Sequence, residues 1–262
     1  MTKNDANGIL QIAVQRLLGR YPLLGGLVAR WNIRPIRIGT MSIGLGRTGF
    51  DLHFNPDFIT PLPIEQVMAV LHHEARHVLY GHVFMAPEDF PDASALIISQ
   101  EVTVNEGIPE PLPGSPLLLA DYPMLQPDED TEARYERMKQ ALEKEGRLSG
   151  QVVGLGGSNG SSGASGQAIA NGTTVVLSVQ SSSTPAPESQ SDPGVRPLDD
   201  HSRWKEIRDQ GALARNLLDA AIQEILSRNH ALSDYEKDVL EQALKCRGAL
   251  PGRQIEELER QQ

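Results

Sequence analysis

The apolar residues between positions 63 and 81 recur three and four residues apart, which is the pattern of a helix that buries one face. Pro63 suits the first position of this helix, and Gly81 suits its C-cap. A second apolar segment, residues 93–105, is also expected to be helical. The sequence therefore predicts two helices packed in the interior.

The segments before these helices predict more helix and a small sheet. Residues 9–29 indicate one or two amphipathic helices, with breaks at Tyr21-Pro22 and at Gly25-Gly26. Residues 37–43 and 49–54 alternate like strands and are joined by a glycine-rich turn. They predict a β-hairpin that leads into the helix at 63–81, so the fold class is α+β.

The segment from 148 to 198 has the composition of a flexible Gly/Ser/Pro-rich linker, because it is too poor in apolar residues to offset its ordering entropy. Within it, residues 173–179 are β-prone and offer an edge strand as an alternative. A lid that shields the site is a second alternative, and a plain tether is favoured over it. The predicted organisation is a metal-binding domain at 1–147, the linker at 148–198, and a helical segment at 199–262.

The segment after the linker predicts helices again. Apolar residues from Trp204 to Leu226 mark one long amphipathic helix. A capping box formed by Ser233 and Glu236 opens another, which should stop near Gly248. Because these helices cannot bury their apolar stripes alone, we expect them to pack back on the N-terminal domain.

Charge and composition exclude several classes of protein. The net charge of −10 argues against a nucleic-acid partner, because phosphate backbones require a basic face. No apolar stretch is long enough to span a membrane, and the first residues lack the pattern of a signal peptide, so we expect a cytoplasmic protein with no membrane partner. The single cysteine, Cys246, excludes an internal disulfide and is expected to be a buried helix residue.

His73, Glu74 and His77 form an H-E-x-x-H motif inside the helix predicted at 63–81. Two histidines four residues apart share one helix face, so both imidazoles can bind one metal ion. Glu74 is rotated by roughly 100° from His73, where it can reach a metal-held water as general base. The alternative is a pair of core histidines without metal, but a buried polar trio needs partners and favours the metal site.

A third ligand is needed, because a catalytic zinc site usually has three protein ligands and one open position. Glu101 and Asn105 lie four residues apart on the second helix and share a face. We expect Glu101 to be the third ligand and Asn105 to orient it. The alternatives are Glu106, whose place beside Gly107 indicates an exposed face, and an exposed Glu101 without a ligand role.

Four other residues need a role. His201 lies where the chain returns from the linker and is a candidate proton donor or oxyanion stabiliser, with a histidine of no chemical role as the equal alternative. His72 and His82 lie off the ligand face and are expected to be structural. Arg76 is expected to pair with a carboxylate at the helix surface, and a contact with a substrate carboxylate is the alternative.

Several segments together carry a family resemblance: residues 53–58, 73–82, 101–105, 131–135, 200–204 and 248–251. They resemble the metallopeptidase domain that bacteria carry N-terminal to von Willebrand A-like domains. The likeness spans about residues 8–262 apart from the linker. Family members continue into the von Willebrand A-like domain, whereas this sequence stops at Gln262. We therefore expect either a stand-alone enzyme or a partner module on a separate polypeptide.

The resemblance implies a zincin-like fold, a zinc ion and peptidase activity. It points to His73, Glu74 and His77, and to Glu101 where the family more often has aspartate. It also implies that the sheet edge can pair with an extended peptide. The expected function is thus a zinc metallopeptidase acting on a peptide or protein. The alternative is a metal-bearing, non-catalytic module that partners a separate ATPase or von Willebrand A-like protein, and a third reading is a chain without metal.

Overall fold

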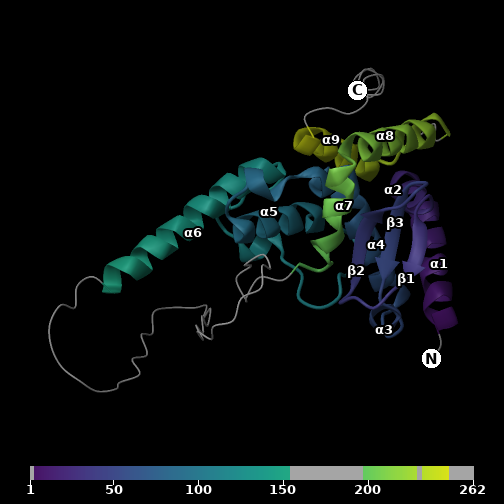
Figure 1. The fold of residues 1–262 in the computed structure, drawn as a ribbon, viewed down its shortest axis with the longest axis horizontal. Coiled ribbons are helices and arrows are strands. Elements are labelled where there is room, and N and C mark those ends of the chain that lie inside the picture. The colour runs from purple at the N-terminus through teal and green to yellow at the C-terminus, as the bar shows by residue number, and fades with distance from the viewer. Residues whose placement is uncertain (1–2, 154–196, 229–231, 248–262) are drawn as a thin grey trace.

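The computed structural model describes residues 3–153, 197–228 and 232–247, and the chain folds as an α+β protein with mostly helices and one small sheet (Figure 1). The predicted strand at 173–179 and most of the predicted linker lie outside the described residues, as does the segment 248–251. One boundary of that linker differs from the prediction, because α6 (Thr131–Val153) continues past residue 148.

The N-terminal helices are α1 (Lys3–Arg20) and α2 (Pro22–Val28). The break at Tyr21-Pro22 is where the sequence predicts it, with proline in the first turn of α2. The predicted break at Gly25-Gly26 is wrong, since both glycines lie inside α2. They serve close packing instead: a Cβ on Gly25 would lie 2.2 Å from the Cα of Leu18.

The sheet has three strands, β1 (Asn32–Pro35), β2 (Met41–Leu45) and β3 (Phe50–Phe54), in the order β1-β3-β2. The predicted hairpin is present as the antiparallel pair β2-β3, in which Ile43 faces Leu52. β1 pairs with β3 in parallel and was not predicted, because it has only four residues and ends in proline, which argues against a strand. β2 is therefore an edge strand.

Two buried helices follow, as predicted. After the short α3 (Pro56–Ile59), α4 (Ile64–Leu79) runs through the interior, and every residue from Val67 to Leu79 is buried. Gly81 ends this region with a φ of 82°, which is a left-handed conformation that favours glycine. Two short 3-10 helices follow, η1 (His82–Phe84) and η2 (Pro87–Asp89). The next helix is α5 (Ala93–Asn105), and the side chain of Asp92 caps its N-terminus.

α5 and α6 share a second, smaller apolar cluster, which includes Leu96, Ile98, Tyr135 and Met138. η3 (Leu119–Asp121) lies in the long connection between these helices. Figure 1 shows α6 extending away from the rest of the described chain. The main core, in contrast, joins α1, α2, the sheet and α4.

The C-terminal elements are η4 (His201–Arg203), α7 (Trp204–Asp209), α8 (Gly211–Arg228) and α9 (Asp234–Arg247). The single long helix predicted from residue 204 is wrong, since the chain leaves helical geometry at Gln210. Leu218, Ile222 and Ile225 belong to the main core, so α8 packs on the N-terminal half.

The capping box at the start of α9 also contributes to this packing. Glu236 Oε2 accepts hydrogen bonds from the backbone N–H and the hydroxyl of Ser233. Its Oε1 accepts a hydrogen bond of 2.7 Å from the backbone N–H of Leu23 at the start of α2. One carboxylate thus holds two helix N-termini together. Within the described residues, no helix combines the length and apolar character needed to cross a membrane.

Candidate metal centre

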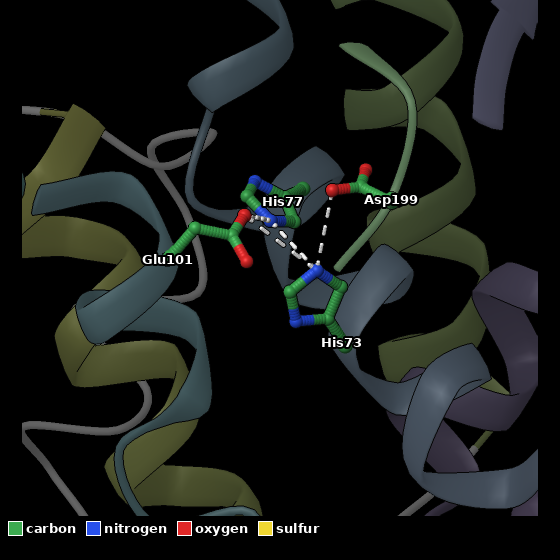
Figure 2. Close-up of side chains that lie close together, drawn as sticks. All are labelled: His73, His77, Glu101 and Asp199. Atoms are coloured by element: carbon green, nitrogen blue, oxygen red, sulfur yellow. Dashed lines mark hydrogen bonds and ion pairs between the residues drawn. The ribbon is translucent and has the colours of Figure 1, made fainter. Parts of the chain in front are cut away.

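The two motif histidines point at one another from successive turns of α4. His73 Nε2 and His77 Nε2 lie 3.0 Å apart, and both side chains are fully buried (Figure 2). Two imidazole nitrogens at this separation either share a proton or aim their lone pairs at one cation. The tautomers fixed by their other nitrogens decide between these arrangements.

Each histidine is oriented through its Nδ1. His73 Nδ1 lies 2.8 Å from Asn105 Oδ1, while the amide nitrogen of Asn105 donates to the carbonyl of Leu117. Asn105 therefore accepts the Nδ1 proton of His73 and leaves a lone pair on Nε2. Asn105 was predicted to orient Glu101; the structure shows it bonded to His73 instead. A hydrogen bond of this kind fixes the tautomer of a metal ligand.

A second set of hydrogen bonds fixes His77. His77 Nδ1 lies 3.0 Å from His82 Nδ1, and His82 Nε2 lies 2.7 Å from the hydroxyl of Thr131. With the His82 proton on Nε2, His82 Nδ1 accepts the Nδ1 proton of His77. Both motif histidines then present unprotonated Nε2 atoms to the same point. His82 is off the ligand face, as predicted, and its structural role is to orient a ligand.

Glu101 comes from α5 and reaches the same point. Its Oε1 lies 3.3 Å from His77 Nε2 and 3.9 Å from His73 Nε2, and its side chain is fully buried. Burial alone would raise the pKa of Glu101, but when protons rather than a metal occupy the Nε2 atoms, the positive charge of His73 and hydrogen bonds from His201 and His77 hold it below its usual value. Of the two sequence candidates, Glu101 is thus the one at the site. Glu106 is turned away and pairs with Arg134.

Asp199 is a fourth donor that the sequence prediction did not include. Its Oδ1 lies 3.5 Å from His73 Nε2, its side chain is fully buried, and the donor atoms of His73, His77, Glu101 and Asp199 all lie within 4.8 Å of one another. Zinc bonds of about 2.0–2.1 Å in a tetrahedron place neighbouring ligands about 3.3 Å apart. Four of the six separations are 3.0, 3.3, 3.5 and 3.9 Å, which are near the lengths that such a tetrahedron requires.

His201 lies beside the two carboxylates rather than among the donors. Its Nε2 is 2.7 Å from Asp199 Oδ1 and 3.5 Å from Glu101 Oε1, and its ring stacks on Trp204 with centroids 3.7 Å apart. Burial lowers the pKa of His201, but the charge of Asp199, with hydrogen bonds to Asp199 and Glu101, outweighs burial and raises it to about 10. The raised pKa favours a protonated His201 that donates its Nε2 proton to Asp199.

Glu74 lies one residue along the helix from His73, as the motif requires. The side chain is fully buried, and neither carboxylate oxygen has a hydrogen-bond partner within the described part of the chain. Burial, followed by the negative charges of Asp199 and Glu101, raises its pKa well above the usual value. A carboxylate in this position is unsatisfied until a proton or a cation reaches it.

Three buried carboxylates meet at the centre, Glu74, Glu101 and Asp199, and His201 contacts the last two. Without a metal, the raised pKa values of Glu74, His73 and His201 indicate that protons offset this negative charge. A divalent cation at the donor cluster is the alternative to those protons, because burying unpaired charge is costly.

Comparison with known proteins agrees with a metal centre of this kind. Residues 7–86 match the family model described as "Putative metallopeptidase domain". The match includes His73, Glu74 and His77 and ends before Glu101 and Asp199.

An uncharacterised protein of Thermotoga maritima is 29% identical over 103 residues, which are 39% of this chain. Those residues are 25% of that relative, so the chain spans only a quarter of its length. No solved structure matches the chain.

Two other residues of α4, His72 and Arg76, face away from the candidate metal centre. His72 is held by Glu110 at 3.3 Å and by the hydroxyl of Tyr235 at 2.8 Å, which agrees with the predicted structural role. The surface position predicted for Arg76 is wrong. Arg76 is 3% exposed and donates to the carbonyls of Val104 and Glu106 and to Tyr235. Arg76 therefore connects α4 to the end of α5.

Proposed function

We propose that this protein is a zinc-dependent metallopeptidase with a zincin-like arrangement, in which His73, His77 and Glu101 hold the metal. The observation that carries the proposal is the cluster of four buried donor atoms within 4.8 Å of one another, beside a glutamate that has no hydrogen-bond partner among the described residues. Two imidazoles with carboxylates are a donor set that suits zinc. The family match over residues 7–86 supports peptidase chemistry.

When bound, zinc at this place would polarise the scissile carbonyl and lower the pKa of a bound water toward about 7. Glu74 is placed to take a proton from that water, because it is adjacent to His73 and neither of its oxygens is hydrogen-bonded to a described residue. His201 carries a proton that it can share with the developing oxyanion or the leaving amine. Asn105 and His82 keep the two imidazoles in the tautomer that binds metal.

One observation favours the alternative, a metal-bearing module without catalysis that serves as a partner of another protein. Four protein donors surround the centre, and structural zinc sites have four protein ligands, whereas catalytic sites keep one position for water. The two functions therefore differ in whether Asp199 stays bound to the metal when a substrate binds.

Substitution of the proposed base tests the enzyme function. Glu74→Gln should retain zinc and lose about 10²–10⁴-fold of its turnover of fluorescently labelled casein or of a quenched peptide library. Glu65→Gln is a matched control, because Glu65 lies in the first turn of α4, where its side chain is 56% exposed. Equal turnover by Glu74→Gln and the wild type would exclude Glu74 as the base. A zinc-loaded wild type without turnover would favour the non-catalytic module.

A further inference from the structure

Asp199 reaches the metal centre on a short segment that lies along the free edge of the sheet. The backbone N–H of Asp200 donates to the carbonyl of Met41 in β2 at 2.8 Å. The hydroxyls of Thr40 and Ser42 donate to the carbonyls of Leu198 and Asp200, at 2.8 and 2.5 Å. Asp200 has extended backbone angles of −106° and 102°. Residues 198–200 thus occupy the edge of β2 as a short extended peptide would.

The same segment also contacts a metal donor through its backbone. The N–H of Leu198 donates to Glu101 Oε2 at 3.0 Å, while Glu101 Oε1 faces His77. Between Leu198 and Asp200, the side chain of Asp199 enters the donor cluster. The chain therefore covers both parts of a peptidase site at once: the edge that pairs with a peptide backbone and the position that a catalytic metal leaves open.

We propose that residues 198–200 are an internal occupant of the substrate groove, with Asp199 as a displaceable metal ligand, so that this structure is the latent form of the enzyme. The inference rests on the proposed peptidase function. It predicts that the segment and an extended peptide compete for the edge of β2, and that Asp199 and a water compete for the metal.

The contacts that hold the segment suit such an exchange. Its backbone is held at the site by hydrogen bonds of a kind that any extended peptide can make. The anchor lies just downstream, where Trp204 is 3% exposed and Ile207 is fully buried in the main core. Departure of residues 198–200 from the groove exposes Leu198, which packs on the main core, and breaks the contact between Asp199 and His201, but it leaves α7 in place.

Binding of acetohydroxamate to the cobalt-substituted full-length chain tests the proposal, because acetohydroxamate binds at an open metal position. The wild type should bind one cobalt ion, and its visible spectrum should change little on addition of acetohydroxamate. Asp199→Ala should still bind cobalt and should bind acetohydroxamate at least about tenfold more tightly. Ser42→Ala removes one hydrogen bond to the segment without touching a donor, and should give a smaller gain of about fivefold.

Ser99→Ala is the matched control, because the buried hydroxyl of Ser99 donates to the carbonyl of Ala95 in its own helix, and its loss should leave the probe affinity unchanged. If Asp199→Ala binds cobalt but gains no affinity for acetohydroxamate, Asp199 does not close the metal position. If Asp199→Ala loses cobalt, Asp199 is a permanent ligand. Either result overturns latency and leaves the wild-type metal site intact. A wild type that binds no cobalt overturns the metal centre itself, and the inference with it.

Discussion

His77 lies between His73 and His82, and each of its two ring nitrogens contacts one of them. His77 Nε2 lies 3.0 Å from His73 Nε2, and His77 Nδ1, on the other side of the ring, lies 3.0 Å from His82 Nδ1. The His77 ring is thus fixed at both nitrogens inside the core. Hydrogen bonds of this kind fix the tautomer and the ring orientation of a histidine that binds a metal.

Asn105 should set the metal affinity through His73. Asn105→Ala removes the acceptor of the His73 Nδ1 proton, and loss of such a partner typically weakens metal binding about 10–100-fold. Asn105→Asp keeps an acceptor oxygen and should retain most of the affinity. Competition with a chromogenic chelator measures both. Gln100→Ala on the same helix is the control, since Gln100 contacts Met85 and no donor; equal affinity of Asn105→Ala and wild type would contradict the orienting role.

Arg134 should be more important for stability than its neighbour Arg137. Arg134 is fully buried and bonds to Glu106, Gln126 and Thr103, whereas the Arg137 side chain is 48% exposed. Removing one partner of a buried pair leaves an uncompensated charge, so Arg134→Ala should lower the free energy of unfolding by about 3 kcal/mol. Arg137→Ala should cost less than about 1 kcal/mol. Urea unfolding measures the free energy of unfolding of both variants. Similar losses would show that the buried contacts of Arg134 stabilise the protein no more than the exposed contacts of Arg137.

Gly25 and Gly8 should respond in opposite directions to alanine. A Cβ at Gly25 would meet the backbone of Leu18 at 2.2 Å, so Gly25→Ala must separate α1 from α2 and should cost about 1–3 kcal/mol or more. Gly8 lies in α1 with nothing within 4 Å of its Cβ position, so Gly8→Ala should stabilise by about 0.5–1 kcal/mol. Thermal unfolding gives the sign of each change. A neutral Gly25→Ala would mean that the two helices are not packed this closely.

His72 should make the protein sensitive to acid. Burial, with a smaller effect from Arg76, outweighs the hydrogen bond to Glu110 and lowers the pKa of His72 to about 4. A histidine with a depressed pKa contributes stability above its unfolded pKa of about 6.5, and that contribution is lost as the pH falls toward 4. His72→Gln should therefore lose less stability than the wild type between pH 6.5 and 4, as urea unfolding at each pH would show. Parallel pH profiles would mean that His72 is not the titrating group.

The sequence was sufficient to place the local parts of this site. α4 and α5 follow from apolar spacing, and the positions of His73 and His77 follow from helix geometry alone. Glu101 could be chosen because its helix had to face the motif. These are features within one helix or between two consecutive buried helices, where periodicity carries the information.

The parts that the sequence did not place depend on contacts between distant segments. Asp199 is 126 positions from His73, and its neighbour Asp200 reaches β2 across the sheet edge, which no local pattern encodes. The adjacent pair Asp199-Asp200 before His201 is the signal in the sequence. It was not used, because His73, His77 and Glu101 already give the three protein ligands of a catalytic zinc site. The surface position predicted for Arg76 was wrong for the same reason. Its partners on α5 and α9 lie near it only in the folded chain, where the helices pack together.

Elemental analysis of zinc in the purified full-length chain tests the central claim most directly. The wild type and His72→Gln should each contain one zinc ion per chain, since His72 faces Glu110 and Tyr235 rather than the donor cluster. His77→Gln should contain none, because the site loses a donor and the partner of His82. A wild type purified without chelators that holds no zinc, or a His77→Gln variant that holds as much as the wild type, would contradict the metal centre described for this protein.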